Sequence, residues 1–240
     1  MRHTRIAPRP ARLQSGWRMA NNARRVASAL RKRYRDHSHH NRRNPLEELL
    51  YILCSTQTQE SSYRSTYSAL RREFSTFTKL AEAPAEYIAK PLMPGGLYRN
   101  KSKAIRKICD SIMERFGRLT LSPLRSMSGR ECEEFLLSLP GVGKKVARCV
   151  MMYSLDREVF PVDTHCWRIA KRLGWVRPTQ KGGHCAPRDM DRLQQKLPPE
   201  LRFSLHVGFV SLGREFCTAH EARCGGCPLE AVCPKLTKHR

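Results

Sequence analysis

Acidic side chains are scarce in this chain. Its 240 residues include 21 Asp and Glu against 45 Lys and Arg, which gives a formal net charge of +24. Such an excess, with a pI near 10.3, favours a polyanionic partner, most often nucleic acid, over a basic surface that is merely solvated. A hydrophobic content of 40% is enough to build a folded core.

Long apolar runs are missing as well. No stretch reaches the roughly 18 apolar residues of a membrane helix, and the N-terminus has no apolar secretory segment. We therefore expect an intracellular protein, in the cytoplasm or nucleoid of a bacterium or in the nucleus or mitochondria of a eukaryote. In such a compartment its ten cysteines should be free thiols or metal ligands. The Arg-rich leader is also compatible with a mitochondrial transit peptide.

Alternation of apolar and polar residues, the pattern of half-buried strands, is rare here, and short helical patterns joined by turns replace it. Asn44 and Pro45 have the residue types that begin a helix, and Gly117 the type that ends one. Ser128 and Glu131 have the spacing of a capping box. The sequence predicts an all-α fold, preceded by a basic N-terminal segment with thirteen Lys and Arg and one acid in residues 1–43.

The stretch "LPGVGKKVA", residues 139–147, predicts a tight turn between two helices. Gly141 turns the chain, and Gly143 lets the next helix begin close to whatever lies opposite. Backbone N–H groups at such a helix start bind phosphate readily. We interpret residues 141–144 as the DNA-binding turn of a helix-hairpin-helix, although a plain turn between two helices has the same outline.

Lys144 and Lys145 occupy the first helical turn, where the helix dipole disfavours a cation. That position, with a second cation alongside, lowers the pKa of a lysine toward the range in which a neutral amine attacks carbon. Two lysines that only bind phosphates are an equal alternative. Asp163, 18 residues beyond Lys145, can cap the helix of "DTHCWRIAKRLG", and a capping carboxylate also remains available for catalysis.

Four cysteines near the C-terminus have the spacing of a metal centre. Cys217, Cys224, Cys227 and Cys233 form C-x6-C-x2-C-x5-C within 17 residues. Four thiolates so close in sequence can enclose one zinc ion or one iron–sulfur cluster, and the spacing slightly favours the cluster. The other six cysteines are scattered along the chain.

Together these motifs resemble the endonuclease III family of DNA glycosylases, within the helix-hairpin-helix superfamily. The resemblance spans roughly residues 44–235 and includes "NPLEELLYILCSTQTQ", "GLYRNKSKAI", "LPGVGKKVA", "VDTHCWRIAKRLG" and the cysteine spacing, in the family's order. It implies two helical lobes and a [4Fe–4S] cluster. We accordingly assign residues 1–17 to a flexible basic arm, 18–43 with 158–236 to the cluster lobe, 44–157 to a six-helix barrel with the hairpin, and 237–240 to a tail.

The resemblance also implies roles for single residues. Lys145 takes the place of the family's Schiff-base nucleophile, and Asp163 that of its catalytic aspartate. Gln57 matches the residue that fills the gap left by a flipped-out base, and Leu97 matches a strand-wedging leucine; as alternatives, Gln57 only caps a helix and Leu97 only packs. Val142 and His165 are expected to contact DNA, and the four cysteines to hold the cluster.

The expected activity is therefore that of a monomeric, bifunctional glycosylase and abasic-site lyase, which removes oxidised pyrimidines from duplex DNA and nicks by β-elimination. Monofunctional relatives lack a lysine at position 145. Two alternatives stay open: catalysis on mismatched uracil or thymine, or on abasic sites alone, and a non-catalytic DNA-binding protein. Base choice depends on the shape of a pocket that the sequence does not describe.

Overall fold

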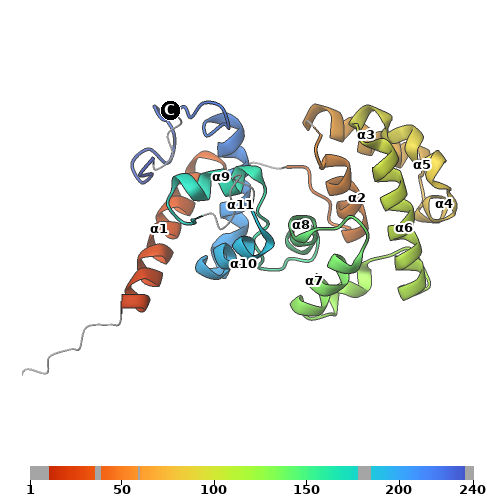
Figure 1. The fold of residues 1–240 in the computed structure, drawn as a ribbon, viewed down its shortest axis with the longest axis horizontal. Helices are drawn as coiled ribbons and strands as arrows, with labels where there is room; N and C mark the ends of the chain where they lie inside the picture. The colour runs from red at the N-terminus through yellow and green to blue at the C-terminus, as the bar shows by residue number, and fades with distance from the viewer. Residues whose placement is uncertain (1–10, 36–38, 59, 178–184, 236–240) are drawn as a thin grey trace, which may run out of the picture. The chain divides into compact units, whose positions relative to one another are not determined.

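A computed structural model describes residues 11–35, 39–58, 60–177 and 185–235. Every regular element in these ranges is a helix, and the only β-type pairing described is an isolated bridge between Cys217 and Ala222 (Figure 1). The all-α prediction is confirmed. None of the helices described is both long and apolar enough to cross a membrane.

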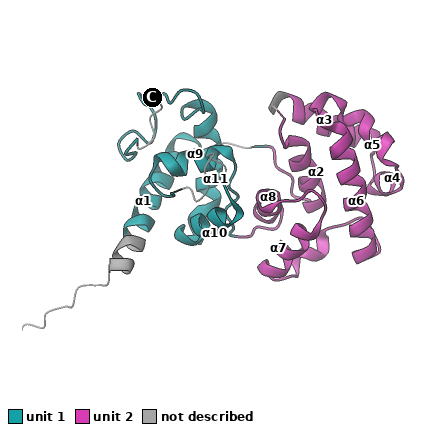
Figure 2. Cartoon of the chain, viewed as in Figure 1, with its two compact units in different colours: residues 1–39, 158–240 teal, residues 40–157 magenta. Residues whose placement is uncertain are grey.

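The chain divides into two compact units (Figure 2). Unit 1 contains residues 1–39 and 158–240, and unit 2 contains residues 40–157. The lobe limits expected from the sequence, including a first boundary after residue 43, stay a prediction. Helix α1 begins at Ala11, so residues 11–17, expected to be an arm, are helical; they include the good helix formers Ala, Arg, Leu and Gln and no proline. Residues 1–10 and 236–240 lie outside the described part.

Unit 2 consists of helices that follow one another along the chain. They are α2 (Pro45–Ser55), α3 (Glu60–Glu73), α4 (Phe77–Glu82), α5 (Ala85–Leu92), α6 (Tyr98–Phe116), α7 (Gly129–Ser138) and α8 (Lys144–Ser154), with 3-10 turns η1 (Met93–Gly95) and η2 (Ser122–Arg125).

The ends of these helices follow from local sequence. Asn44 Oδ1 accepts hydrogen bonds from the backbone nitrogens of Leu46 and Glu47, and Pro45 occupies the first helical position of α2. Ser128 and Glu131 form the predicted capping box of α7. Gly117 ends α6 with a φ of 68°, a left-handed conformation that favours glycine. These starts and stops need no tertiary contact.

Unit 1 brings the two ends of the chain together. It contains α1 (Ala11–Arg33), α9 (Thr164–Arg172), α10 (Pro187–Lys196), the 3-10 turn η3 (Pro199–Leu201), α11 (Arg202–Glu215) and a loop with the four spaced cysteines. Helix α11 packs against both α1 and α9. A Cβ on Gly208 of α11 would lie 2.9 Å from Leu30 of α1, so glycine there permits the close approach of the two helices.

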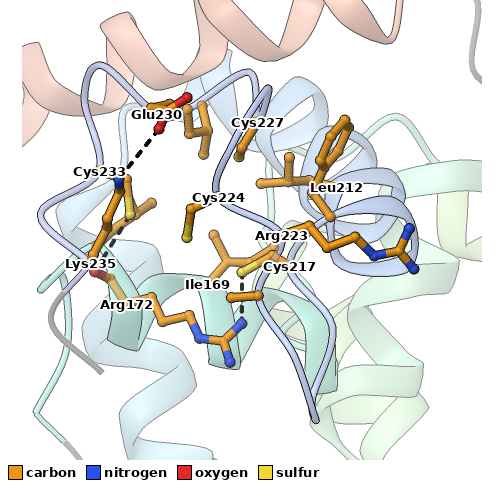
Figure 3. Close-up of a pocket in the computed structure, with 14 residues that line it drawn as sticks. Ile169, Arg172, Leu212, Cys217, Arg223, Cys224, Cys227, Glu230, Cys233 and Lys235 are labelled. Carbon is orange, nitrogen blue, oxygen red and sulfur yellow. Dashed lines mark hydrogen bonds and ion pairs between the residues drawn. The ribbon is translucent and has the colours of Figure 1, made fainter. Parts of the chain in front are cut away.

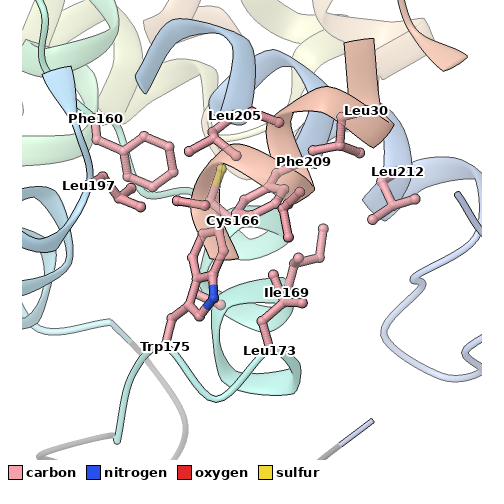
Figure 4. Packing of buried hydrophobic residues seen from close by; sticks show 14 of the residues in the cluster. Leu30, Phe160, Cys166, Ile169, Leu173, Trp175, Leu197, Leu205, Phe209 and Leu212 are labelled. Atoms are coloured by element: carbon pink, nitrogen blue, oxygen red, sulfur yellow. The ribbon is translucent and has the colours of Figure 1, made fainter. Parts of the chain in front are cut away.

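The core of unit 1 is built from all of these segments (Figure 4). The Trp175 ring packs against Phe209 at a centroid distance of 5.5 Å, and its Nε1 donates to Asn22 Oδ1 of α1 at 2.7 Å. Further core members from α1, α9 and α11 are Leu30, Cys166, Ile169, Leu205 and Leu212. The core thus fixes α9, which carries Asp163 at its start, against both ends of the chain.

Candidate functional site

The hairpin turn has the geometry of a phosphate site. Helix α7 ends at Ser138, Gly141 turns the chain with a φ of 78°, and α8 begins at Lys144 after Gly143. No side chain caps α8. The N–H groups of a helix start, together with the positive end of the helix dipole, suit an anion. Val142 is buried, so only its backbone is suited to face a ligand.

Lys145 is half-buried in that first turn, and a buried carboxyl acts on it from within unit 2. Helix α8 packs against α2, which carries Glu48 with no exposed surface. Burial raises the pKa of Glu48 to about 7, although hydrogen bonds from Arg42 and Asn41 and the positive charge of Lys145 each lower it. Lys145 and Glu48 are therefore close enough for the charge state of one to affect the other.

Glu48 also fixes the start of unit 2. Its two carboxylate oxygens accept hydrogen bonds from Asn41 Nδ2 at 2.5 Å and from the backbone nitrogen of Arg42 at 2.6 Å. The Arg42 guanidinium lies over the rings of Tyr51 and Tyr67, at 5.3 and 4.9 Å from their centroids. Sequence reasoning missed Glu48. The available signal was an acid inside an apolar helix, between Leu46 and Leu49, where stability alone favours a hydrophobic residue.

Gln57 and Leu97 share an unusual backbone conformation. Each has a φ of 51°, and both side chains are exposed, that of Leu97 by 50%. A left-handed φ is costly for a residue with a side chain, and an exposed leucine gains little from packing. An exposed Leu97 argues against a role in packing alone. Among the described residues, no helix cap is formed by Gln57. Their contacts to DNA stay predictions.

The turns that carry Gln57 and Leu97 are tied together by one buried lysine. Lys101 of α6, only 7% exposed, donates from Nζ to Cys54 O at 2.9 Å, to Thr58 Oγ1 at 2.7 Å and to Gly95 O at 3.3 Å. Thr58 Oγ1 lies 2.7 Å from Gly95 O. Burial lowers the pKa of Lys101. This cluster, here called the Lys101 clamp, holds the end of α2 beside the turn before α6.

In unit 1, Asp163 caps α9. Its Oδ1 accepts a hydrogen bond from the backbone nitrogen of Cys166 at 2.7 Å. His165, two residues on, receives a hydrogen bond on Nδ1 from Arg168 Nη2 at 2.9 Å, and burial lowers the pKa of this histidine. A Cβ on Gly213 would lie 2.4 Å from His165 Nδ1, so α11 needs glycine there. His165 is thus half-buried against α11, and its contact with DNA stays a prediction.

The four cysteines turn toward one pocket (Figure 3). The pocket has a volume of about 40 Å³ and is lined by Cys217, Cys224, Cys227 and Cys233. Burial raises the pKa of Cys227 and Cys233, and the neighbouring cysteines raise it further. Bound metal would reverse this tendency, because a coordinating thiol is deprotonated.

The four cysteines of the loop line one pocket, and four thiolates around one space suit a zinc ion or an iron–sulfur cluster. In the described residues no three or more His, Cys, Asp or Glu side chains are already gathered as closely as a bound metal ion would hold them. The pocket volume is also about three times what one water needs.

Arg172 supplies the positive charge that such a centre requires. It is 5% exposed, and its Nη1 donates to Cys217 Sγ at 3.0 Å and to Thr218 O at 2.9 Å. Its Nη2 is buried with no hydrogen-bond partner described. A buried guanidinium beside four thiols is poorly compensated when the thiols are neutral and well compensated when they are thiolates. The residues present therefore fit an iron–sulfur cluster.

Comparison with known proteins now identifies the family. A profile of the HhH-GPD superfamily of base excision DNA repair proteins matches residues 50–194. The chain belongs to this superfamily. The matched range of this HhH-GPD protein includes both Lys145 and Asp163 but ends before the four cysteines.

Relatives and solved structures agree with this placement. Endonuclease III of Thermotoga maritima is 29% identical over 195 residues, which cover 81% of this chain and 84% of that protein. A protein of Arabidopsis thaliana, named as a candidate DNA glycosylase, is 34% identical over 175 residues; the match covers 70% of this chain but only 56% of that relative. A solved complex of endonuclease III with DNA has a TM-score of 0.76 and 26% identity, and the match covers 90% of this chain and 95% of that one.

The predicted site residues, together with Glu48 and Lys101 from the structure, fall into separate groups. The hairpin turn, Lys145 and Glu48 share the α2–α8 region of unit 2, and the Lys101 clamp joins the turns of Gln57 and Leu97. Asp163 and His165 lie at the start of α9 in unit 1, whose cysteines line their own pocket. Within each unit the residues are gathered by packing, and their catalytic and DNA-binding roles stay predictions.

Proposed function

We propose that this HhH-GPD protein is a bifunctional DNA glycosylase and abasic-site lyase that removes oxidised pyrimidines from duplex DNA. The observation that supports this most is Lys145 in the first turn of α8, behind a glycine turn that no side chain caps and beside the buried carboxyl of Glu48. A lysine that only stabilised the fold would be disfavoured at that end of a helix.

The chemistry starts with a nucleotide rotated out of the duplex, because a sugar carbon inside the stack is inaccessible. Neutral Lys145 Nζ bonds to C1′ while the C1′–N bond to the base breaks, and the base leaves with the electron pair and takes up a proton. Loss of the amine proton and opening of the C1′–O4′ bond give an imine. Removal of a C2′ proton then breaks the C3′–O bond and cuts the strand.

Other residues prepare this step. Asp163 carries a carboxylate that stabilises positive charge developing on the sugar or assists proton transfer. The proposed reaction thus assigns Lys145 the role of nucleophile and Asp163 that of a supporting carboxylate. Gln57 and Leu97, held by the Lys101 clamp, fill and wedge the space that the nucleotide leaves.

Cys217, Cys224, Cys227 and Cys233 would hold a [4Fe–4S] cluster, with Arg172 compensating its negative charge. The bound cluster supplies a covalent cross-link to a loop that contains no helix. Protein purified anaerobically from iron-replete cells should contain about four iron and four sulfide per chain and be brown. A colourless protein with one zinc ion would overturn this assignment.

Borohydride trapping tests the proposal. The purified protein is incubated with labelled duplexes that contain a thymine glycol, an abasic site or no lesion, and the imine is reduced to a stable adduct. We expect an adduct on the first two duplexes that disappears in Lys145→Ala. Lys79→Ala is the matched control, because it removes an exposed lysine of α4 that has no part in the proposed site and should keep the adduct.

Other results of the trapping assay would each support a different function. Trapping on the abasic duplex alone would leave a lyase without activity on oxidised pyrimidines, and uracil or thymine mismatches would then be tested in the same assay. Nicking by Lys145→Ala would remove this lysine from the mechanism. No adduct on any duplex, with DNA binding intact, would leave a monofunctional glycosylase or a DNA-binding protein.

A further inference from the structure

A second feature of unit 1 lies apart from the residues proposed for catalysis. A surface groove, here called the basic groove, runs between α1 and the cysteine loop and has a volume of about 650 Å³. Its α1 side is formed by Arg25, Ser28, Ala29, Lys32 and Arg33, and its loop side by Gly226, Pro228 and Val232. Ala29 and Val232 also pack against the hydrophobic core, so the groove rests on ordered structure.

The charge of the groove is of one sign. None of its lining residues is acidic, and α1 has no Asp or Glu in its 23 residues. Arg33 pairs with Glu215 at 2.5 Å, but Arg25 and Lys32 make no hydrogen bond or ion pair with the described residues. A helix adapted only for stability places acids three or four residues from such cations. Arg25 and Lys32 are therefore the groove cations that are available to an anionic ligand.

The spacing of these cations suits a nucleic-acid backbone. Arg25 and Lys32 are seven residues apart on one helix, which separates them by about 10 Å along its axis. About three base-pair steps of duplex DNA cover the same distance. The groove is also far larger than a single phosphate needs, so a chain of phosphates fits it better than a lone anion.

The opposite wall argues against base recognition. Pro228 and Val232 offer no aromatic face on which an unpaired base could stack. The backbone nitrogen of Gly226 is already bonded to Glu230 Oε2 at 3.3 Å. The groove therefore offers cations and a small apolar wall, which match phosphate and sugar rather than base edges.

We propose that the basic groove binds the phosphate backbone of duplex DNA, without regard to sequence, as a contact additional to the hairpin turn. The inference rests on the proposed function in that both assume a DNA substrate. Its consequence is distinct: the groove contributes affinity and salt dependence, and it takes no part in bond breaking. Because Gly226, Pro228 and Val232 belong to the cysteine loop, the same loop that the cluster orders provides one wall.

The test compares two double variants with the same loss of charge. Arg25→Ala with Lys32→Ala removes the two groove cations that have no acidic partner among the described residues. Arg31→Ala with Arg35→Ala removes two exposed cations that do not line it. Binding of full-length protein to an undamaged duplex is measured by fluorescence anisotropy between low and moderate salt, and circular dichroism confirms that both variants are folded.

We expect the slope of log K against log salt to become shallower by about 1.8 in the groove variant, since each lost phosphate contact removes about 0.9. In the control variant, Arg31→Ala with Arg35→Ala, the slope should change by less than half of that amount. Equal losses in the two variants, or no loss in the groove variant, would overturn the proposal.

Borohydride trapping at saturating protein separates this proposal from the proposed function. The groove variant should trap as much abasic duplex as the wild type once all DNA is bound, whereas a loss of adduct at saturation would place the groove in the chemistry and overturn the inference. If the wild type itself forms no adduct, the proposed catalysis fails, and the two salt slopes still decide the groove.

Discussion

Unit 2 and unit 1 hold their functional residues by different means. In unit 2 the contacts lie within one continuous stretch of chain, residues 40–157, as where Lys101 bonds to Cys54 and Glu48 to Asn41. In unit 1 the closing contacts span almost the whole chain, as between Arg33 and Glu215, 182 residues apart, or Trp175 and Asn22, 153 residues apart. Unit 2 can therefore form before the C-terminal third is made, and unit 1 cannot.

The cysteines show the same contrast. In unit 2, burial raises the pKa of Cys54 to about 12 and of Cys109 and Cys132 to about 11, which keeps these thiols neutral and unreactive. The four spaced cysteines of unit 1 are only half-buried, in a loop without helix. Cys54, Cys109 and Cys132 of unit 2 act as small hydrophobic residues, as Cys166 does in the core of unit 1. The four spaced cysteines instead lie in a loop that a metal centre would stabilise.

The largest expected effect tests this contrast directly. Cys224→Ala should lower the free energy of unfolding of unit 1 by more than about 3 kcal/mol, because a structural metal centre loses a ligand. Cys132→Ala in unit 2 should cost about 1 kcal/mol for a small cavity. All three tryptophans, at positions 17, 167 and 175, belong to unit 1, so denaturation followed by tryptophan fluorescence reports on that unit, and far-UV circular dichroism follows the helices of unit 2 in Cys132→Ala. Similar small losses in both variants would contradict a structural cluster.

In unit 2, the largest loss of stability is expected on mutation of the Lys101 clamp. Lys101→Met keeps the volume but leaves the carbonyl of Cys54 without its buried donor and removes one of the two donors to Gly95 O, and should lower the free energy of unfolding by about 2 to 3 kcal/mol. Base removal should fall further than folding explains, because the turns of Gln57 and Leu97 lose their link. Lys103→Met, exposed on the same helix, is the control. Unchanged base removal in folded Lys101→Met protein would show that the clamp does not position these turns.

Glu48 should make the stability of unit 2 depend on pH. The folded protein holds the Glu48 proton up to about pH 7, whereas the unfolded chain releases it near the ordinary pKa of 4.5. The folded state binds more protons in this window, so the free energy of unfolding falls as the pH rises through it, by about 2 to 3 kcal/mol.

Glu48→Gln cannot ionise and should remove that slope, at a uniform cost of about 1 kcal/mol for a weakened hydrogen bond. Chemical denaturation followed by circular dichroism from pH 4.5 to 8 measures the free energy of unfolding and its slope against pH. As the control, Glu47→Gln removes the charge of the neighbouring residue and should keep the pH dependence of the wild type. Identical pH profiles for wild type and Glu48→Gln would mean that Glu48 is not held as a neutral acid.

The smallest effect on stability is expected at Asp163, where capping and catalysis can be separated. Asparagine caps a helix about as well as aspartate, so Asp163→Asn should change the free energy of unfolding by less than about 0.5 kcal/mol, whereas Asp163→Ala loses the cap and about 1 kcal/mol. Base removal in single-turnover assays should fall at least about 100-fold in both variants. Normal base removal by Asp163→Asn would leave Asp163 as a cap only.

Much of the fold could be predicted because its signals are local. Asn44, Pro45, Ser128, Glu131 and Gly117 define helix ends through contacts within a few residues, and the hairpin turn follows from its glycines. The order of motifs and the cysteine spacing were enough to indicate the superfamily. For the helix ends and the hairpin turn, the physical cause lies within a few residues of the chain.

Only the tertiary structure showed Glu48, the Lys101 clamp and the basic groove. Burial, which shifts the pKa of Glu48 and isolates Lys101, depends on helices that pack from elsewhere in the sequence, and no local pattern reports it. The groove needs α1 and a loop nearly 200 residues later to meet. The sequence determined by itself which helices form, where they end and which residues carry reactive groups; the packing of distant segments decided which of those groups are buried, paired or left open to a ligand.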